Sequence, residues 1–405
     1  MEKKEKLIFT LIVALPIIDI LTSLTEHVPL SVGALIRTGF MFFLFMYIFN
    51  YLISKKFIYT IIFLLPFLCI MLTFIINYLI KQPFLLTSEI NFSIKTAYFL
   101  VIIFTVLLLL KRKKFINKDV LLRASGYASI IIGASFWIAI LTNTNIKSYS
   151  YVKTGFSGWF HSANELSVIV IILLTLSIIH YHYEKSPLTI LVLTALLSVL
   201  PMIGTKAAFY GGVIIITMYI ISIFYTKQLK SNLPFWIVIV LWLFVLPFSP
   251  VMTNKFTYVD PPEQTEEIKQ EEKITQLLSS RDVYLNETKE NYLNASFIRK
   301  IFGLGYAGDY KTHPKMIEMD FYDLFFSYGV IGTILLLLPL PFLLNQILTY
   351  KRSISYILLL LTIGLCAGIS FVAGHVLFAP SVMTYIGILI YIAGIEGKSR
   401  LNQNE

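Results

Sequence analysis

The chain has 405 residues, of which 57% are hydrophobic and 14% are charged, and its formal net charge is +10. Soluble domains carry about 25% charged residues, so this composition, with a mean hydropathy of +0.77, excludes a soluble globular protein and indicates an integral membrane protein. The two cysteines, Cys69 and Cys366, fall inside apolar stretches and cannot join exposed loops.

Twelve apolar stretches are long enough to cross a membrane as helices, which takes about 20 residues. Only helices or closed barrels satisfy all backbone hydrogen bonds in lipid, and continuous runs of Leu and Ile lack the alternation of barrel strands. We therefore predict an all-α polytopic membrane protein with about 12 transmembrane helices. The stretches are 7–24, 29–50, 57–80, 90–110, 120–142, 163–182, 187–203, 205–225, 233–250, 321–348, 354–374 and 376–394.

Lys and Arg residues predict the orientation, because short cytoplasmic loops carry an excess of them. With the N-terminal MEKKEK inside, most flanking basic residues fall in inner segments, above all in KRKKFINK (111–118). The short outer loops hold only Lys81, Lys147 and Lys153. We therefore place both termini in the cytoplasm of a multi-pass protein of the cytoplasmic membrane. This charge favours anionic membrane lipid as a partner and argues against nucleic acid.

One outer segment, 251–320, differs in composition and divides the chain into three parts. It opens with the acidic stretch VDPPEQTEEIKQEEK, and 274–302 then carries apolar residues at helical spacing. This pattern predicts one or two amphipathic helices on the membrane surface. We expect nine transmembrane helices over 1–250, one large extracytoplasmic loop over 251–320, and three further helices with a cytoplasmic tail over 321–405.

Basic residues inside apolar stretches are the first candidate site. A charge at a helix centre costs about 2.5–3.5 kcal/mol on insertion scales. Each could reach lipid headgroups or pair with an acid such as Asp19 or Glu89. Because all are predicted near the outer side, they could instead meet Arg281 of the loop around one anion, and a diphosphate is the membrane-borne anion that needs several cations. The three residues are Arg37, Lys95 and Lys206.

Acidic residues gather where the tenth predicted helix begins. The stretch HPKMIEMDFYD (313–323) holds His313, Glu318, Asp320 and Asp323 directly before a long apolar run. These carboxylates could cap the helix N-terminus, where free N–H groups and the helix dipole favour negative charge. Alternatively, one of them could act as a general base at the boundary between water and lipid.

Four stretches, in this order, resemble landmarks of the O-antigen ligase and O-antigen polymerase superfamily. They are GFSGWFHSANELSVIV (155–170), GTKAAFYGG (204–212), SSRDVYLNETKENYL with IFGLGY (279–306), and EMDFYDLFFSYGVIGTI (318–334). The resemblance covers about 150–335. It implies a GT-C-like bacterial membrane glycosyltransferase that uses an undecaprenyl-diphosphate-linked glycan donor and a glycan or lipid acceptor outside the cytoplasmic membrane.

The resemblance also implies roles for particular residues. Arg281 matches the loop arginine that binds the donor diphosphate, and Lys206 stands where relatives usually have arginine; Arg37 and Lys95 complete this cation set. Asn164 matches a substrate-binding asparagine, with His161 close by in sequence.

The catalytic base is left open by a departure from the family pattern. Glu318 and Met319 stand where ligases of the family show His-Asn, so the base could be Glu318, Asp320 or His313. No Cys/His cluster has metal-ligand spacing, so we expect neither a metal nor another cofactor.

Three classes of function are compatible with these patterns. The leading one is glycan transfer or polymerisation, in which cations stabilise the leaving diphosphate and a base takes the proton of the acceptor hydroxyl. The others are a flippase for lipid-linked oligosaccharides and a scaffold for other polysaccharide-assembly proteins. Ligase and polymerase stay unresolved because they differ only in their acceptor.

Overall fold

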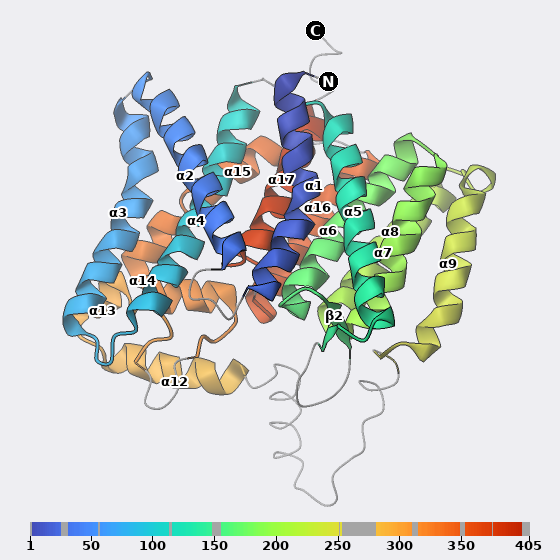
Figure 1. Cartoon of the computed structure of the whole chain (residues 1–405). Helices are drawn as coiled ribbons and strands as arrows, with labels where there is room; N and C mark the ends of the chain where they lie inside the picture. Colours follow the sequence, from blue (N-terminus) through green and yellow to red (C-terminus); the bar gives the residue numbers. More distant parts are fainter. Residues whose placement is uncertain are drawn as a thin grey trace, which may run out of the picture.

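The chain folds into a bundle of long helices, seen in the computed structural model of Figure 1. The structure describes residues 2–25, 31–55, 57–112, 116–147, 155–250, 252, 281–309, 315–348, 353–374 and 376–398. Within this part, 11 helical segments are long and apolar enough to cross a membrane, and α7 is a shorter apolar helix. The prediction of an all-α polytopic membrane protein is confirmed.

The helices that form the bundle are, in chain order, α1 (Lys3–Leu24), α2 (Val32–Ile53), α3 (Phe57–Ile80), α4 (Leu86–Lys111), α5 (Lys118–Leu141), α6 (Ala163–Tyr183), α7 (Pro187–Ile203), α8 (Lys206–Tyr225), α9 (Leu233–Val245), α14 (Asp320–Leu337), α15 (Pro339–Ile347), α16 (Ile354–Val372) and α17 (Pro380–Lys398). Two short strands, β1 (Ile146–Lys147) and β2 (Phe156–Gly158), pair antiparallel between α5 and α6. The 3-10 turns η1 (Lys230–Asn232) and η2 (Leu246–Phe248) flank α9.

Three of the predicted helices are divided, end in a 3-10 turn or begin later in the structure. The tenth, predicted as one span over 321–348, consists of α14 followed by α15, and α14 contains non-helical backbone at Gly329. The ninth ends in the 3-10 turn η2. The twelfth begins at Pro380 rather than near residue 376, because 376–379 form a turn that is hydrogen-bonded to Asp320.

The predicted amphipathic region over 274–302 contains α12 (Arg281–Asn294) and α13 (Phe297–Phe302). Its residues before Arg281 lie outside the described part of the chain. In Figure 1, α12 crosses the end of the bundle opposite to the start of α1. It therefore covers the end at which α4, α6, α14 and α17 begin.

The core of the bundle is built around α6, which is apolar on all sides. Most of its residues are buried, and it packs against α5, α7, α8, α16 and α17. A helix that is hydrophobic all round belongs in the interior, whereas α1 and α2 lie at the periphery and bury few residues. This arrangement places the N-terminus of α6 at the centre of the α12 end.

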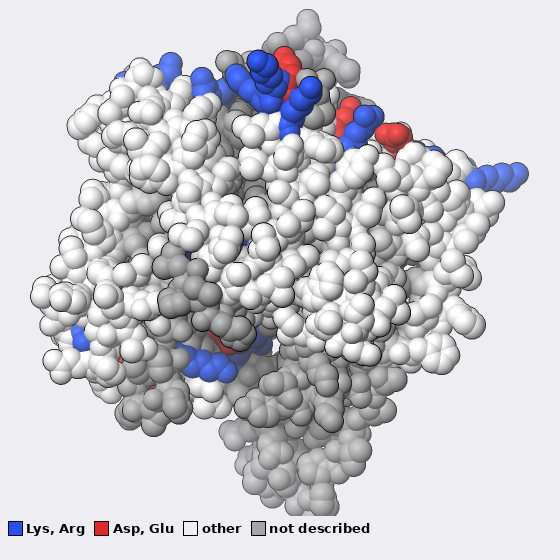
Figure 2. Space-filling model, in the orientation of Figure 1, with Lys and Arg blue, Asp and Glu red and all other residues white. Residues whose placement is uncertain are grey.

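Charged residues are unevenly distributed over the surface. Figure 2 shows Lys and Arg side chains gathered at the end where α1 begins, above a broad belt almost without charge. Such a belt is what the hydrocarbon of a bilayer requires. The protein is a multi-pass membrane protein.

Candidate active site

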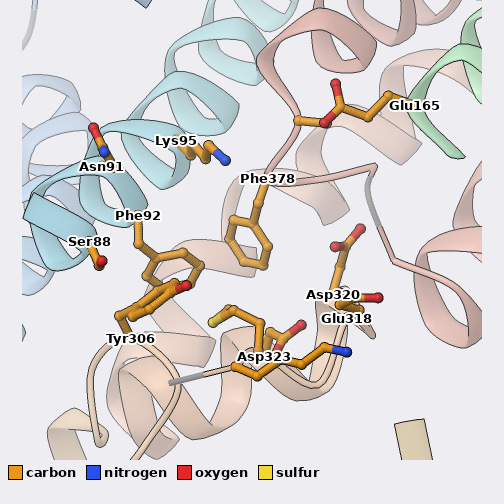
Figure 3. Close-up of a pocket in the computed structure, with 13 residues that line it drawn as sticks. Ser88, Asn91, Phe92, Lys95, Glu165, Tyr306, Glu318, Asp320, Asp323 and Phe378 are labelled. Carbon is orange, nitrogen blue, oxygen red and sulfur yellow. The ribbon is translucent and has the colours of Figure 1, made fainter. Parts of the chain in front are cut away.

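A cavity of about 360 Å³ lies where α4, α6, α14 and α17 begin (Figure 3). Each helix N-terminus carries a partial positive charge, so this convergence favours negatively charged groups. The lining includes four carboxylates and two lysines. It consists of Ser88, Asn91, Phe92, Lys95, Glu165, Tyr306, Lys315, Met316, Glu318, Asp320, Asp323, Phe378 and Ala379.

One face of α4 forms a large part of this lining. Ser88, Asn91, Phe92 and Lys95 recur at the spacing that places side chains on the same side of a helix. Lys95 is exposed and makes no ion pair with any residue that the structure describes. The cavity therefore contains a cation that is available to a ligand.

Glu165 reaches the cavity from the first turn of α6. The α6 N-terminus is set by Ser162, whose hydroxyl accepts a hydrogen bond from the Glu165 backbone N–H at 3.3 Å. The Glu165 carboxylate in turn accepts a hydrogen bond from Ser381 of α17. This N-cap determines the residue at which α6 begins, and therefore places Glu165 in the first turn, where its side chain lines the cavity.

Glu318 has the most unusual backbone in the site. Its φ is +62°, and this left-handed conformation costs an L-residue about 1–2 kcal/mol. The Glu318 side chain is 34% exposed, and its carboxylate accepts a hydrogen bond of 3.3 Å from Nη2 of Arg281. The Arg281 side chain is only 11% exposed. Strain of this kind is concentrated at functional sites. The turn is supported by Gly374, where an added Cβ would lie 2.5 Å from the Glu318 carbonyl oxygen.

The two neighbouring carboxylates are held by hydrogen bonds from the backbone. Oδ2 of Asp320 accepts bonds from the Ser370 hydroxyl at 2.8 Å and from the N–H groups of Val376 and Leu377, both at 2.9 Å. The two oxygens of Asp323 accept from the N–H groups of residues 317 and 319 at 2.9 and 3.1 Å. These carboxylates close the turns that shape the cavity.

The four predicted cations do not all meet. Lys95 lines the cavity, and Arg281 reaches it through Glu318. Arg37 instead pairs with Asp19 of α1 and donates to the Thr22 hydroxyl at 3.5 Å. Pairing with Asp19 was one of the two alternatives that the sequence left open for this residue. Lys206 is exposed at the start of α8 and does not line the cavity.

The remaining candidates are placed as follows. His161 is exposed and Asn164 is half-buried next to the start of α6, and neither lines the cavity. His313 lies outside the described residues. Sequence reasoning missed Glu165, Lys315 and Tyr306. A signal existed for each, since Glu165 follows Asn164 directly, Lys315 belongs to the acidic stretch itself, and Tyr306 ends the GLGY turn.

Metal-ligating side chains do not gather in the described part of the chain, where no group of three or more His, Cys, Asp or Glu residues has a geometry that could hold an ion. The cavity itself offers carboxylates, cations and aromatic rings.

The family model described as O-antigen ligase like membrane protein matches residues 1–276 and 255–393. No curated protein and no solved structure matches the chain.

Proposed function

Because the chain belongs to the family of O-antigen ligase-like membrane proteins, which implies a membrane glycosyltransferase acting on lipid-linked glycans, we propose that this cavity is its active site. The donor is an undecaprenyl-diphosphate-linked glycan, and the acceptor is a hydroxyl of a second glycan or of a lipid. The reaction takes place on the outer face of the cytoplasmic membrane, with both termini in the cytoplasm. In this orientation, the basic end in Figure 2 faces the cytoplasm, as the distribution of Lys and Arg in membrane proteins favours.

The observation that carries this proposal is the pairing of Glu318 and Arg281 at a cavity that also holds Lys95. Transfer breaks the bond between the anomeric carbon and the diphosphate oxygen, so negative charge grows on the leaving group. The acceptor hydroxyl must lose its proton at the same time. An acid–base group and cations are needed within reach of one ligand, and this is the place in the described structure that supplies both.

Glu318 is the base in this proposal. Its carboxylate is partly exposed and is oriented by Arg281, whereas the Asp320 and Asp323 carboxylates are engaged with backbone N–H groups. A general base of this kind contributes about 10²- to 10⁴-fold to a rate. The backbone of Glu318 supports the assignment, because a left-handed conformation is unfavourable for glutamate and such strain is concentrated at functional sites.

Lys95 and Arg281 are the cations that face the leaving diphosphate. Arg281 offers a planar fork suited to phosphate oxygens, and Lys95 acts as a mobile point charge on the opposite helix. The partial positive charge at four helix N-termini adds to this field. Arg37 contributes indirectly by joining α1 to α2.

The test is a transfer assay with purified chain in proteoliposomes that contain undecaprenyl-diphosphate-linked glycan, with the outer-leaflet amount of donor measured separately. Glu318→Gln is expected to lower transfer at least about 100-fold, and Arg281→Gln is expected to lower it as well, while donor translocation is unchanged. Glu287→Gln and Lys289→Gln, at exposed positions of α12, are the matched controls and are expected to transfer normally.

Two results would overturn the proposal. One is transfer by Glu318→Gln within about threefold of the unmodified protein, since a base that contributes 10²-fold or more cannot be removed at so small a cost. The other is loss of donor from the outer leaflet in the same variants, which would assign the site to translocation instead.

A further inference from the structure

The cavity has an aromatic wall that the acid–base chemistry does not use. Phe92 lies at its centre, with ring centroids 6.0 Å from Tyr306 and 4.9 Å from Phe378. Behind it, Tyr328 stacks on Phe92 at 5.6 Å and donates a hydrogen bond to Thr96. In Figure 3, the rings of Phe92 and Tyr306 lie on one side of the cavity and Glu318 and Asp320 on the other.

Tyr306 is the most exposed of the lining rings, and its backbone is fixed from both sides by a buried ion pair. Its N–H donates to Oε2 of Glu89 at 2.9 Å, and its carbonyl oxygen accepts from Nζ of Lys81 at 2.5 Å. Lys81 and Glu89 pair at 2.7 Å, with side chains only 1% and 4% exposed. A buried ion pair stabilises little by itself, but here it determines where one aromatic ring stands.

The preceding GLG turn is shaped for the same placement. Leu304 N–H donates to the Phe326 carbonyl at 2.8 Å and Gly305 N–H donates to the Ser327 carbonyl at 3.1 Å, so the turn lies along α14. A Cβ on Gly305 would stand 2.9 Å from both carboxylate oxygens of Glu89. The backbone that carries the Tyr306 ring is thus held in advance of any ligand, which lowers the entropy lost on binding.

The groups beside this ring have unused hydrogen-bonding capacity. The side chains of Ser88 and Asn91 make no hydrogen bond with any residue that the structure describes, although both line the cavity. Burial, followed by the charges of Asp323 and Glu89, raises the pKa of Tyr306, so its phenol is a neutral O–H donor at physiological pH. The wall therefore combines the faces of tilted aromatic rings with hydroxyl and amide groups at its margin.

A pyranose ring fits this combination, because its C–H face packs on an aromatic ring while its hydroxyls point sideways to polar partners. A lipid chain would leave Ser88 and Asn91 without partners, and a phosphate would gain nothing from the rings. The charge of the lining adds a condition. The charges that act on the Tyr306 ring itself include the carboxylates of Glu89 and Glu318, whereas Lys95 and Arg281 are assigned to the leaving diphosphate. A sugar that carries its own carboxylate would therefore meet repulsion at this ring.

We propose that the wall formed by Phe92, Tyr306 and Phe378, in which Tyr306 is the most exposed ring, is a subsite for an uncharged pyranose ring of the glycan. This proposal rests on the proposed function only in taking a glycan as the occupant. In this arrangement the sugar ring packs on the aromatic wall, while the acceptor hydroxyl reacts at the Glu318 carboxylate on the other side of the cavity.

The test measures binding apart from transfer. The full chain is placed in lipid nanodiscs, so that no glycoside detergent competes, and saturation-transfer NMR is recorded with methyl β-glucopyranoside, methyl N-acetyl-β-glucosaminide and methyl β-glucuronide. At least one neutral glycoside is expected to bind, and the glucuronide to bind at least about fivefold more weakly. Tyr306→Ala is expected to weaken neutral binding about tenfold.

Matched variants distinguish the contribution of the Tyr306 ring to glycoside binding from that of its hydroxyl and from an effect on folding. Tyr306→Phe keeps the ring and is expected to retain most of the affinity, and Phe42→Ala, at a 63% exposed position on α2, is expected to bind normally. Should Tyr306→Ala fail to fold, Asn91→Ala at an exposed position of α4 gives the same comparison. Undiminished binding in both variants, equal binding of the glucuronide, or no binding of any of the three glycosides would each overturn the subsite.

The outcome is distinguishable from failure of the proposed function. Glu318→Gln is expected to bind the neutral glycoside as the unmodified chain does, because its carboxylate does not belong to the wall. Binding without transfer in the unmodified chain would overturn the proposed function and leave the subsite standing. Transfer without binding would do the reverse.

Discussion

Asp320 and Glu318 are two residues apart and both line the cavity, yet we propose different roles for them. Replacing Asp320 with Ala removes the acceptor of three hydrogen bonds and leaves the N–H groups of the buried Val376 and the half-buried Leu377 without it. Each orphaned buried donor costs about 1–3 kcal/mol. The free energy of unfolding is therefore expected to fall by about 2–5 kcal/mol, since the turn before α17 loses its anchor. Asp320→Asn keeps one acceptor oxygen and is expected to lose less.

The assay is equilibrium unfolding by denaturant in mixed micelles, run beside the transfer assay on the same preparations. Glu318→Gln serves as the counterpart, because the position is 34% exposed and the Gln amide oxygen still offers the Arg281 guanidinium an acceptor. It is expected to unfold almost as the unmodified protein does and yet to lose transfer. The reasoning is refuted if Asp320→Ala unfolds within about 0.5 kcal/mol of the unmodified protein while transfer is abolished. That result would make Asp320 the base.

Three further predictions concern backbone strain and ion pairing. Glu318→Gly is expected to be more stable than Glu318→Ala by about 1 kcal/mol in the same unfolding assay, because only Gly adopts φ +62° without strain, whereas both lack the carboxylate. Gly329→Ala is expected to destabilise the protein by more than about 2 kcal/mol, since its Cβ would lie 2.4 Å from the Ile301 carbonyl; Gly364→Ala, with open space around it, is the control. Arg37→Leu alone is expected to destabilise, and Asp19→Leu with Arg37→Leu to recover both stability and transfer.

Each of these has a contrary outcome that the same measurements detect. Equal stability of the Gly and Ala variants at Glu318 would show that the left-handed backbone costs nothing. A Gly329→Ala protein as stable as its control would show that the kink in α14 relaxes freely. Recovery of stability without recovery of transfer in the Asp19 and Arg37 double variant would return Arg37 to the donor site.

The fold could be predicted largely from composition, because a long apolar segment in lipid must satisfy its own backbone hydrogen bonds, and a helix does so. The seventh span was located at 187–203, where α7 lies. The interruptions were less visible. The local sequence around Tyr328 and Gly329 does not predict that Gly329 adopts φ +65°. This conformation accompanies the close approach of Ile301 and Gly303, which are distant in the sequence.

The site was predictable in its ingredients and less so in its geometry. A sequence shows that Arg37 and Lys95 lie inside apolar helices, but which way each side chain turns depends on how the helix is rotated by its neighbours. Contact with α1 places Arg37 next to Asp19, whereas the polar face of α4 turns Lys95 into the cavity. Helical spacing could have found the second case, since Ser88, Asn91 and Lys95 share one face.

Glu318 shows where local rules fail and why that failure is informative. Propensity would place Gly or Asn at φ +62°, and a Glu there is stable only because Gly374 and Arg281 hold the turn from two directions. A chain gains stability by replacing such a residue unless its side chain is needed at that point. Positive φ alone does not single out Glu318, because Lys227 and Ala307 share it. Together with the partial exposure of the carboxylate and its contact with Arg281, it supports our proposal that Glu318 rather than the better-anchored Asp320 is the base.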